Sequence, residues 1–284
     1  MRVVAVLGGG GAKCIAHPGA WKALQEVGAE IVHVIGTSMG AVVGAALAGG
    51  RSPESVLHTA ASLLAKDVAA VDWLSLARGM FATSLLKPEA LRRTIARFVS
   101  ERSFAALKLP LTVTVTDLDT GDLALFGAPV AEAGPIRHLG DQVPLVDALY
   151  ASCALPLYFD PMLLSDRRLA DGGLRAVLPI DFAMSVAADL VVAIDVGPGF
   201  DETPAPGTRS LAPPLIRAHG VAIRIMMAAQ TERAISRWPA GAPRLIVVRA
   251  VAEREATFAL GQSKRYFDAG YETTKEALRA TFGA

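Results

Sequence analysis

Residues 36–40, which read Gly-Thr-Ser-Met-Gly, constrain the fold more than any other stretch of the chain. An apolar, β-branched segment precedes them at 31–35, and small apolar residues typical of a buried helix follow at 41–47. A Gly-x-Ser-x-Gly pattern between a strand and a helix is typical of a nucleophile elbow, a tight turn with a strained backbone at the serine. The pattern predicts that Ser38 is presented to a substrate, although a glycine-rich turn with an incidental serine has the same spacing.

The rest of the chain alternates strand patterns with helix patterns. Residues 2–7 form a β-branched run without polar alternation, which is typical of a strand buried on both faces of a parallel sheet. Further strands are predicted at 111–117, 123–126, 190–196 and 244–251, and helices at 17–27, 53–66, 87–99, 179–187, 215–238 and 264–281. This alternation, without an internal repeat, predicts one α/β domain over residues 1–284 with a mainly parallel central sheet.

Within this predicted domain the chain divides into three parts. The motifs occupy about 2–196, a proline-rich surface loop is expected at about 198–214, and a helix–strand–helix unit is expected at 215–284. Bulky apolar residues between 71 and 86 predict core packing, with a mobile flap beside a pocket as the alternative.

Composition argues against several classes of function. Hydrophobic residues make up 52% of the chain and the mean hydropathy is +0.40, but no run approaches the about 18 apolar residues of a membrane span. A net charge of +1 without a basic cluster argues against nucleic-acid binding. Cys14 and Cys153 lie far apart and outside any Cys-x-x-Cys pair, so neither a disulfide framework nor a zinc site is expected. We therefore expect a cytoplasmic protein.

Four consecutive glycines at residues 8–11 follow the first predicted strand. The dinucleotide pattern Gly-x-Gly-x-x-Gly fails at its third glycine, and the Walker A pattern fails at both residues that flank Lys13. Nucleotide binding is therefore the weaker alternative. Consecutive glycines at a helix N-terminus expose backbone N–H groups in a region of positive potential, which favours an oxyanion hole facing Ser38.

A nucleophilic serine needs a base. Ser38, Asp171 and His219 satisfy the chain order of a Ser–acid–His triad, but His219 lies in a predicted helix beside the proline-rich loop. The other histidines have no nearby acidic pattern and are predicted to be structural. Asp171 heads an Asp-Gly-Gly turn, so a Ser–Asp pair without histidine fits better, although a plain turn aspartate has the same pattern.

Five motifs together resemble the patatin-like phospholipases, a family of lipid acyl hydrolases that use a Ser–Asp dyad. In order, the matching residues are Gly9-Gly10-Gly11-Ala12-Lys13 with His17 and Gly19, then 36–40, Asp117-Leu118-Asp119-Thr120-Gly121, Ala151-Ser152-Cys153-Ala154-Leu155-Pro156 and Asp171-Gly172-Gly173. The resemblance covers about 2–196 and implies a three-layer α/β/α fold.

The resemblance also implies roles for individual residues. Ser38 would be the nucleophile, Asp171 the base, and the backbone of Gly9–Gly11 the oxyanion hole; burial is expected to raise the proton affinity of Asp171. The substrate would be a phospholipid or another lipid ester, reached by transient peripheral contact with a membrane, with acyl transfer as an alternative to hydrolysis. Neither a metal nor a cofactor is required. Lys13 would favour an anionic head group, against the alternative of a solvated loop lysine.

One residue departs from the family's pattern. Cys14 stands where similar proteins carry glycine, so a positive φ at that position would strain the loop and displace an oxyanion donor. This departure leaves open a degenerate member that binds lipid without turnover. A triad esterase that uses His219 is the other alternative.

Overall fold

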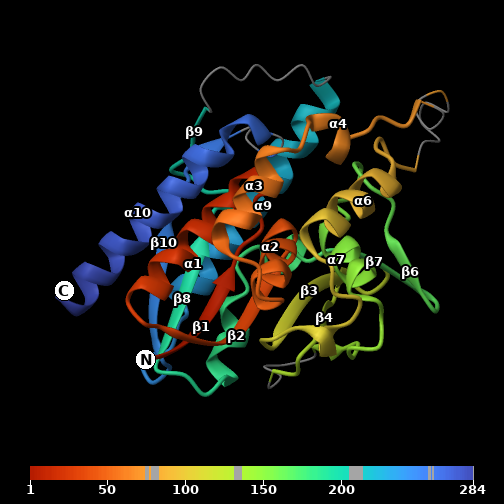
Figure 1. Cartoon of the computed structure of the whole chain (residues 1–284). Coiled ribbons are helices and arrows are strands. Elements are labelled where there is room, and N and C mark those ends of the chain that lie inside the picture. Colours follow the sequence, from red (N-terminus) through yellow and green to blue (C-terminus); the bar gives the residue numbers. More distant parts are fainter. Residues whose placement is uncertain are drawn as a thin grey trace.

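A mostly parallel sheet with helices on both faces forms the framework of the protein (Figure 1). The computed structural model describes residues 1–73, 77, 83–130, 136–204, 214–254, 257 and 259–283. The strands are β1 (Arg2–Leu7), β2 (Glu30–Thr37), β3 (Leu111–Asp117), β4 (Leu123–Gly127), β5 (Arg137–His138), β6 (Met162–Leu164), β7 (Arg167–Asp171), β8 (Leu190–Asp195), β9 (Thr203–Pro204), β10 (Arg244–Arg249) and β11 (Glu253–Arg254).

The helices come between these strands. They are α1 (Ala16–Glu26), α2 (Met39–Ala48), α3 (Pro53–Ala61), α4 (Ala65–Val68), α6 (Pro88–Phe98), α7 (Leu145–Cys153), α8 (Gly173–Ala176), α9 (Pro214–Ser236) and α10 (Ser263–Phe282). Short 3-10 turns are η1 (Gly11–Ile15), η3 (Phe104–Ala106), η4 (Ile180–Ser185) and η5 (Leu260–Gln262).

Strands from the N-terminal and C-terminal parts of the chain lie in the same main sheet. It runs β10-β8-β1-β2-β3-β4-β5, with all neighbours from β10 to β3 parallel. Strands β4 and β7 pair antiparallel to β3, and β6 pairs with β7. Because parallel strands end at the same edge, the segments after β1, β2 and β8 meet there. The α/β fold with a mainly parallel sheet, predicted from the alternating patterns, is confirmed.

Burial on both faces of β1 explains its unbroken apolar sequence. Val3, Ala5 and Leu7 pack into a cluster with α1, α2, α3, α6, α7 and α10. Val4 and Val6 pack into a second cluster on the opposite face, against η4 and α9. The three-layer arrangement follows from this division, and Figure 1 shows α10 beside α1 with α9 on the far side of the sheet.

Small residues let α1 and α10 pack with their backbones nearly in contact. A Cβ atom added at Gly19 would lie 1.9 Å from the carbonyl oxygen of Phe267, and one added at Gly270 would lie 1.9 Å from that of Ala16. Side chains at these positions would push the helices apart. This packing explains why glycine occupies position 19, which belongs to the first motif.

Several predicted elements differ from the observed ones. The single helix predicted at 53–66 is divided into α3 and α4, and the helix predicted at 179–187 is the 3-10 turn η4. Residues 74–76 and 78–82 of the apolar segment, and residues 205–213 of the proline-rich loop, lie outside the described residues. Among the residues that the structure describes, no helix is long and apolar enough to cross a membrane.

Candidate active site

The turn between β2 and α2 has the strained geometry of a nucleophile elbow. Ser38 has a φ of 55° and a ψ of −135°, one of the few positive φ values at a non-glycine residue. A Cβ at Gly36 would lie 2.6 Å from the Cα of Ala41, and one at Gly40 would lie 2.3 Å from the carbonyl oxygen of Leu7. Only glycine fits at both flanks, so the predicted sharp turn is confirmed.

Ser38 and Asp171 are in direct contact. Ser38 Oγ donates a hydrogen bond of 2.8 Å to Asp171 Oδ2, and the N–H of Gly173 donates one of 2.7 Å to Asp171 Oδ1. The carboxylate comes from the end of β7, where Asp171 lies opposite Val115 of β3. Thr116 Oγ1 donates to the carbonyl oxygen of Asp171 at 2.9 Å and fixes its backbone. Both oxygens of the carboxylate are therefore oriented, one of them toward the serine.

The Asp171 carboxyl is a stronger base than an ordinary aspartate. Its burial raises the pKa from 3.8 to about 6, against the opposing effect of the hydrogen bonds from Gly173 and Ser38. The residue is 5% exposed. Desolvation disfavours the charged form of a carboxyl, which is the reason for the direction of the shift. The expectation that burial raises the proton affinity of Asp171 is confirmed.

Ser152 supports the elbow, a role that the sequence did not reveal. Its Oγ accepts a 2.8 Å hydrogen bond from the N–H of Ser38 and donates one of 2.7 Å to the carbonyl oxygen of Thr114. Thr37 adds a second link, because its Oγ1 donates to the carbonyl oxygen of Ala176 at 2.8 Å. The motif around Ser152 signalled the residue's importance, but only the fold brings α7 against the elbow.

The glycine loop faces the serine. Of the N–H groups at Gly9–Gly11, one is bound within the protein, and two have no acceptor oxygen among the described residues. A Cβ at Gly9 would lie 3.2 Å from the Cβ of Ser38, so loop and serine are in contact. The N–H of Gly9 donates to the carbonyl oxygen of Val177 at 2.9 Å and is not available to an oxyanion, which corrects its expected place among the donors. Among the described residues, the N–H groups of Gly10 and Gly11 have no acceptor oxygen, although the backbone of Gly10 interacts with the Cys14 thiol.

Lys13 is neither solvated nor free to meet a head group. The residue is 4% exposed, and its Nζ lies 2.8 Å from Glu202 Oε1. The same atom donates to the carbonyl oxygens of Glu253 at 2.9 Å and Gly197 at 3.4 Å. The structure therefore contradicts both sequence-based expectations for Lys13, because a distant acidic residue takes up its charge.

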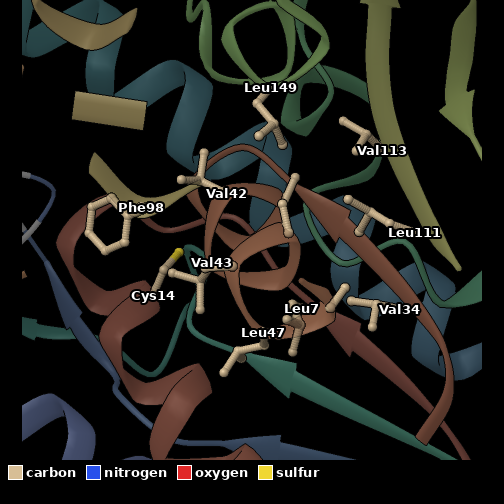
Figure 2. Close-up of a cluster of buried hydrophobic side chains, with 14 of the residues drawn as sticks. Leu7, Cys14, Val34, Val42, Val43, Leu47, Phe98, Leu111, Val113 and Leu149 are labelled. Atoms are coloured by element: carbon tan, nitrogen blue, oxygen red, sulfur yellow. The ribbon is translucent and has the colours of Figure 1, made fainter. Parts of the chain in front are cut away.

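Cys14 does not strain the loop. It lies within η1 and is absent from the residues with positive φ, whereas Gly11 has a φ of 60°. Figure 2 shows Cys14 beside Val43 in the hydrophobic cluster around α2. Burial raises the pKa of its thiol far above the ordinary value, although Lys13 opposes this. The strain at Cys14 on which the alternative of a degenerate member was based is therefore absent.

No described histidine contacts the Ser38–Asp171 pair. His219 lies on α9, its buried Nε2 has no hydrogen-bond partner, and no described hydrogen bond joins it to Ser38 or Asp171. His17 and His33 are buried, contact the carbonyl oxygen of Gly8 and the hydroxyl of Thr112, and have pKa values lowered by burial to about 4. Among the described residues, therefore, no histidine completes a triad with Ser38 and Asp171.

The raised pKa of Asp171 predicts that the residue costs stability at neutral pH. The folded state holds its proton to about pH 6 and the unfolded state only to about 3.8, so stability falls as pH rises between these values. Asp171→Asn removes this cost and can keep the hydrogen bond from Gly173. Urea unfolding should show the variant about 1–3 kcal/mol more stable than the wild type above pH 6, with the gain shrinking toward pH 4.

Asp119→Asn is the control for this measurement. Hydrogen bonds from Arg168 lower the pKa of Asp119, so its replacement should give no gain in stability above pH 6. A gain for Asp171→Asn that does not change with pH would contradict the assignment of the raised pKa.

Comparison with known proteins found relatives of this chain. An NTE family protein of Mycobacterium tuberculosis is 34% identical over 208 residues, which is 72% of this chain and 52% of the relative. The human patatin-like phospholipase domain-containing protein 6 is 34% identical over 201 residues, 71% of this chain and 14% of the relative. The chain thus spans about half the length of the mycobacterial relative and much less of the human one.

A likeness in structure was also found to VipD from Legionella pneumophila. It has a TM-score of 0.49 and 15% sequence identity, and covers 99% of this chain and 67% of that chain.

The family described as Patatin-like phospholipase has a sequence model that matches residues 5–184. This range includes the elbow, the glycine loop and Asp171. The chain therefore belongs to the patatin-like phospholipase family.

Proposed function

We propose that the chain is a serine acyl-ester hydrolase that acts on phospholipid or other lipid esters through Ser38 and Asp171. The observation that carries the proposal is the 2.8 Å hydrogen bond from Ser38 Oγ to a buried carboxylate. Membership of the patatin-like phospholipase family supports the class of substrate. The chemistry needs one nucleophile, one base and donors for a developing oxyanion, and Ser38, Asp171 and the glycine loop are the candidates for these roles.

In the first half of the reaction, Asp171 takes the proton from Ser38 while Oγ attacks the carbonyl carbon of the ester. The N–H groups of Gly10 and Gly11 stabilise the negative charge on the carbonyl oxygen of the tetrahedral intermediate. The intermediate collapses when Asp171 returns the proton to the departing alcohol, which leaves the acyl group on Ser38. A pKa of about 6 suits this exchange, because the carboxyl accepts and releases a proton near neutral pH.

In the second half, water gives a proton to Asp171 and attacks the acyl carbonyl carbon. The bond to Ser38 Oγ then breaks, Asp171 returns the proton to Oγ, and the fatty acid leaves. An alcohol that entered in place of water would give acyl transfer, the alternative with the same intermediate. The two outcomes differ only in the acceptor. The Ser38–Asp171 arrangement serves both.

Ser38→Ala and Asp171→Asn should each lower kcat/KM on a soluble short-chain ester by about 10³-fold or more, because nucleophile and base act as a unit. Wild-type kcat/KM should fall as pH drops below about 6, since a protonated Asp171 cannot accept the serine proton. Steady-state kinetics from pH 4.5 to 8 measures both effects, with circular dichroism as the check on folding.

His219→Ala is the matched control and should keep wild-type kinetics. Loss of activity in this variant together with retained activity in Asp171→Asn would contradict the dyad and favour a triad.

Helix α9 supplies a face suited to transient contact with a membrane. Between residues 214 and 226 it exposes four large apolar side chains, with exposed fractions of 82% at Leu215, 50% at Val221, 45% at Ile225 and 53% at Met226. The exposed positions of this stretch include one charged residue, Arg217. An exposed apolar face with a basic residue matches the boundary between acyl chains and phosphate head groups.

The same helix lies next to the proposed catalytic base. Met227 Cε would lie 3.2 Å from a Cβ added at Gly173, and Gln230 Nε2 donates to the carbonyl oxygen of Leu174 at 2.8 Å. Helix α9 therefore packs on the turn that follows Asp171. A membrane in contact with its exposed face would lie close to the site, which suits a substrate held in that membrane.

The double change Leu215→Ser and Ile225→Ser should weaken binding to phosphatidylcholine vesicles about tenfold or more, because two apolar side chains no longer enter the lipid. Activity on a soluble ester should stay unchanged. Co-sedimentation with vesicles measures the binding.

Phe282→Ser is the control, since Phe282 is 50% exposed at the end of α10, away from the start of α9 (Figure 1). Equal vesicle binding by the double variant and the wild type would rule out this face as the point of contact.

A further inference from the structure

A buried ion pair joins the glycine loop to the C-terminal third of the chain. Lys13 Nζ and Glu202 Oε1 are 2.8 Å apart, and the two side chains are 5% and 2% exposed. The carbonyl oxygens of Glu253 and Gly197 also accept hydrogen bonds from Nζ. All three hydrogens of the ammonium group therefore have an acceptor within the protein.

Lys13 depends on Glu202 for its charge compensation, whereas Glu202 has two cations nearby. Glu202 Oε2 is buried and has no hydrogen-bond partner among the described residues. Arg224 NH1 forms a second, longer ion pair with this oxygen at 3.6 Å. A buried charge is costly unless an opposite charge pairs with it, and Glu202 is the carboxylate that pairs with Lys13 among the described residues. Removal of Glu202 therefore leaves Lys13 as an uncompensated buried charge, whereas Arg224 still faces Glu202 when Lys13 is removed.

The segment that carries Glu202 is itself attached to the sheet. Arg249 at the end of β10 contacts Asp195 at 3.1 Å, Asp201 at 2.8 Å and the carbonyl oxygen of Gly197 at 2.8 Å. The N–H of Thr203 donates to the carbonyl oxygen of Ala252 at 3.1 Å, where β9 pairs with β11. Lys13 is therefore bound to a segment that is itself held against the sheet.

Lys13 is close in sequence to the two glycines whose N–H groups have no acceptor oxygen. It lies in η1, which begins at Gly11 and has Gly10 as its N-cap residue. The only other described polar tie of this turn to the C-terminal third is the 2.8 Å hydrogen bond from the N–H of Ala12 to the carbonyl oxygen of Thr257. Oxyanion donors act only when they are held at the position where the charge develops. A shift of η1 would displace both donors.

We propose that Glu202 is a positioning residue for the oxyanion loop: through its ion pair with Lys13 it fixes η1 and so orients the N–H groups of Gly10 and Gly11. This inference rests on the proposed function, because it requires a tetrahedral intermediate at Ser38. Glu202 lies outside residues 5–184, the part of the chain that the family's sequence model matches. The C-terminal third thus acts on the reaction without contacting the substrate.

Glu202→Gln tests the proposal because it removes the charge and keeps the size of the side chain. On a soluble short-chain ester, kcat should fall about 10- to 100-fold, since misplaced oxyanion donors stabilise the transition state less. KM should change less than about twofold, because the bound ground state has no oxyanion. The pH midpoint set by Asp171 should stay that of the wild type, since the dyad is not altered.

Asp201→Asn is the matched control. Asp201 is the adjacent residue, the change removes the same charge, and its side chain is 56% exposed in its pair with Arg249, which keeps Asp195 and Gly197 as partners. Its kcat should stay within about twofold of the wild type, because exposed ion pairs contribute little.

The pair can be tested further through Lys13. Lys13→Met should reduce kcat as Glu202→Gln does, and the double variant should be no slower than the slower single variant, since both changes remove one interaction. Glu202→Asp keeps the charge on a shorter side chain and should recover part of the lost kcat. This variant carries the test if Glu202→Gln does not fold.

Two results would overturn the inference and leave the proposed function standing. One is a folded Glu202→Gln enzyme with wild-type kcat. The other is a lower melting temperature with unchanged kcat per folded molecule, which would make the ion pair structural only. A wild-type protein without esterase activity would instead reject the proposed function.

Discussion

The base strength of Asp171, which hydrogen-bonds to Ser38, comes from burial of its carboxyl group at the edge of the sheet. In water an aspartate is too weak a base to activate a serine, and burial raises the pKa of Asp171 to about 6. Burial also makes the residue a cost in the folded state, which Gly173 and Ser38 offset in part by donating hydrogen bonds to it. Under the proposed function, the site exchanges some stability for reactivity, as active sites commonly do.

The fold holds this pair by constraints from several directions. The elbow bends because glycines at 36 and 40 let α2 approach β2 and the end of β1. Asp171 reaches the serine because β7 pairs antiparallel with β3, the neighbour of β2. Ser152 at the end of α7 holds the N–H of the strained serine. The C-terminal third contributes from the other side, where Glu202 binds Lys13 behind the glycine loop. The candidate site therefore draws on nearly the whole chain.

Local patterns predicted what local physics decides. The apolar run of β1 and the alternation of β3 gave strands that agree with the structure at both ends, and the Gly-x-Ser-x-Gly pattern gave the turn. Long-range partners decided the rest. The use of the Gly9 N–H by Val177 and the burial of Lys13 against Glu202 leave no trace in nearby sequence, since the partners lie more than 150 positions away. Cys14 is not strained, because the residue of this loop with a positive φ is Gly11. The sequence does not show which residue of the loop adopts this conformation.

An activated Ser38 should react with a fluorophosphonate probe. The probe reacts with an activated serine and needs no knowledge of the natural lipid. Mass spectrometry of the labelled wild type, with Ser38→Ala and Asp171→Asn alongside, locates the adduct. An activated Ser38 predicts one adduct, on Ser38, in the wild type and loss of labelling in both variants. A folded wild-type protein that forms no adduct, or forms it on another residue, would show that Ser38 is not the nucleophile.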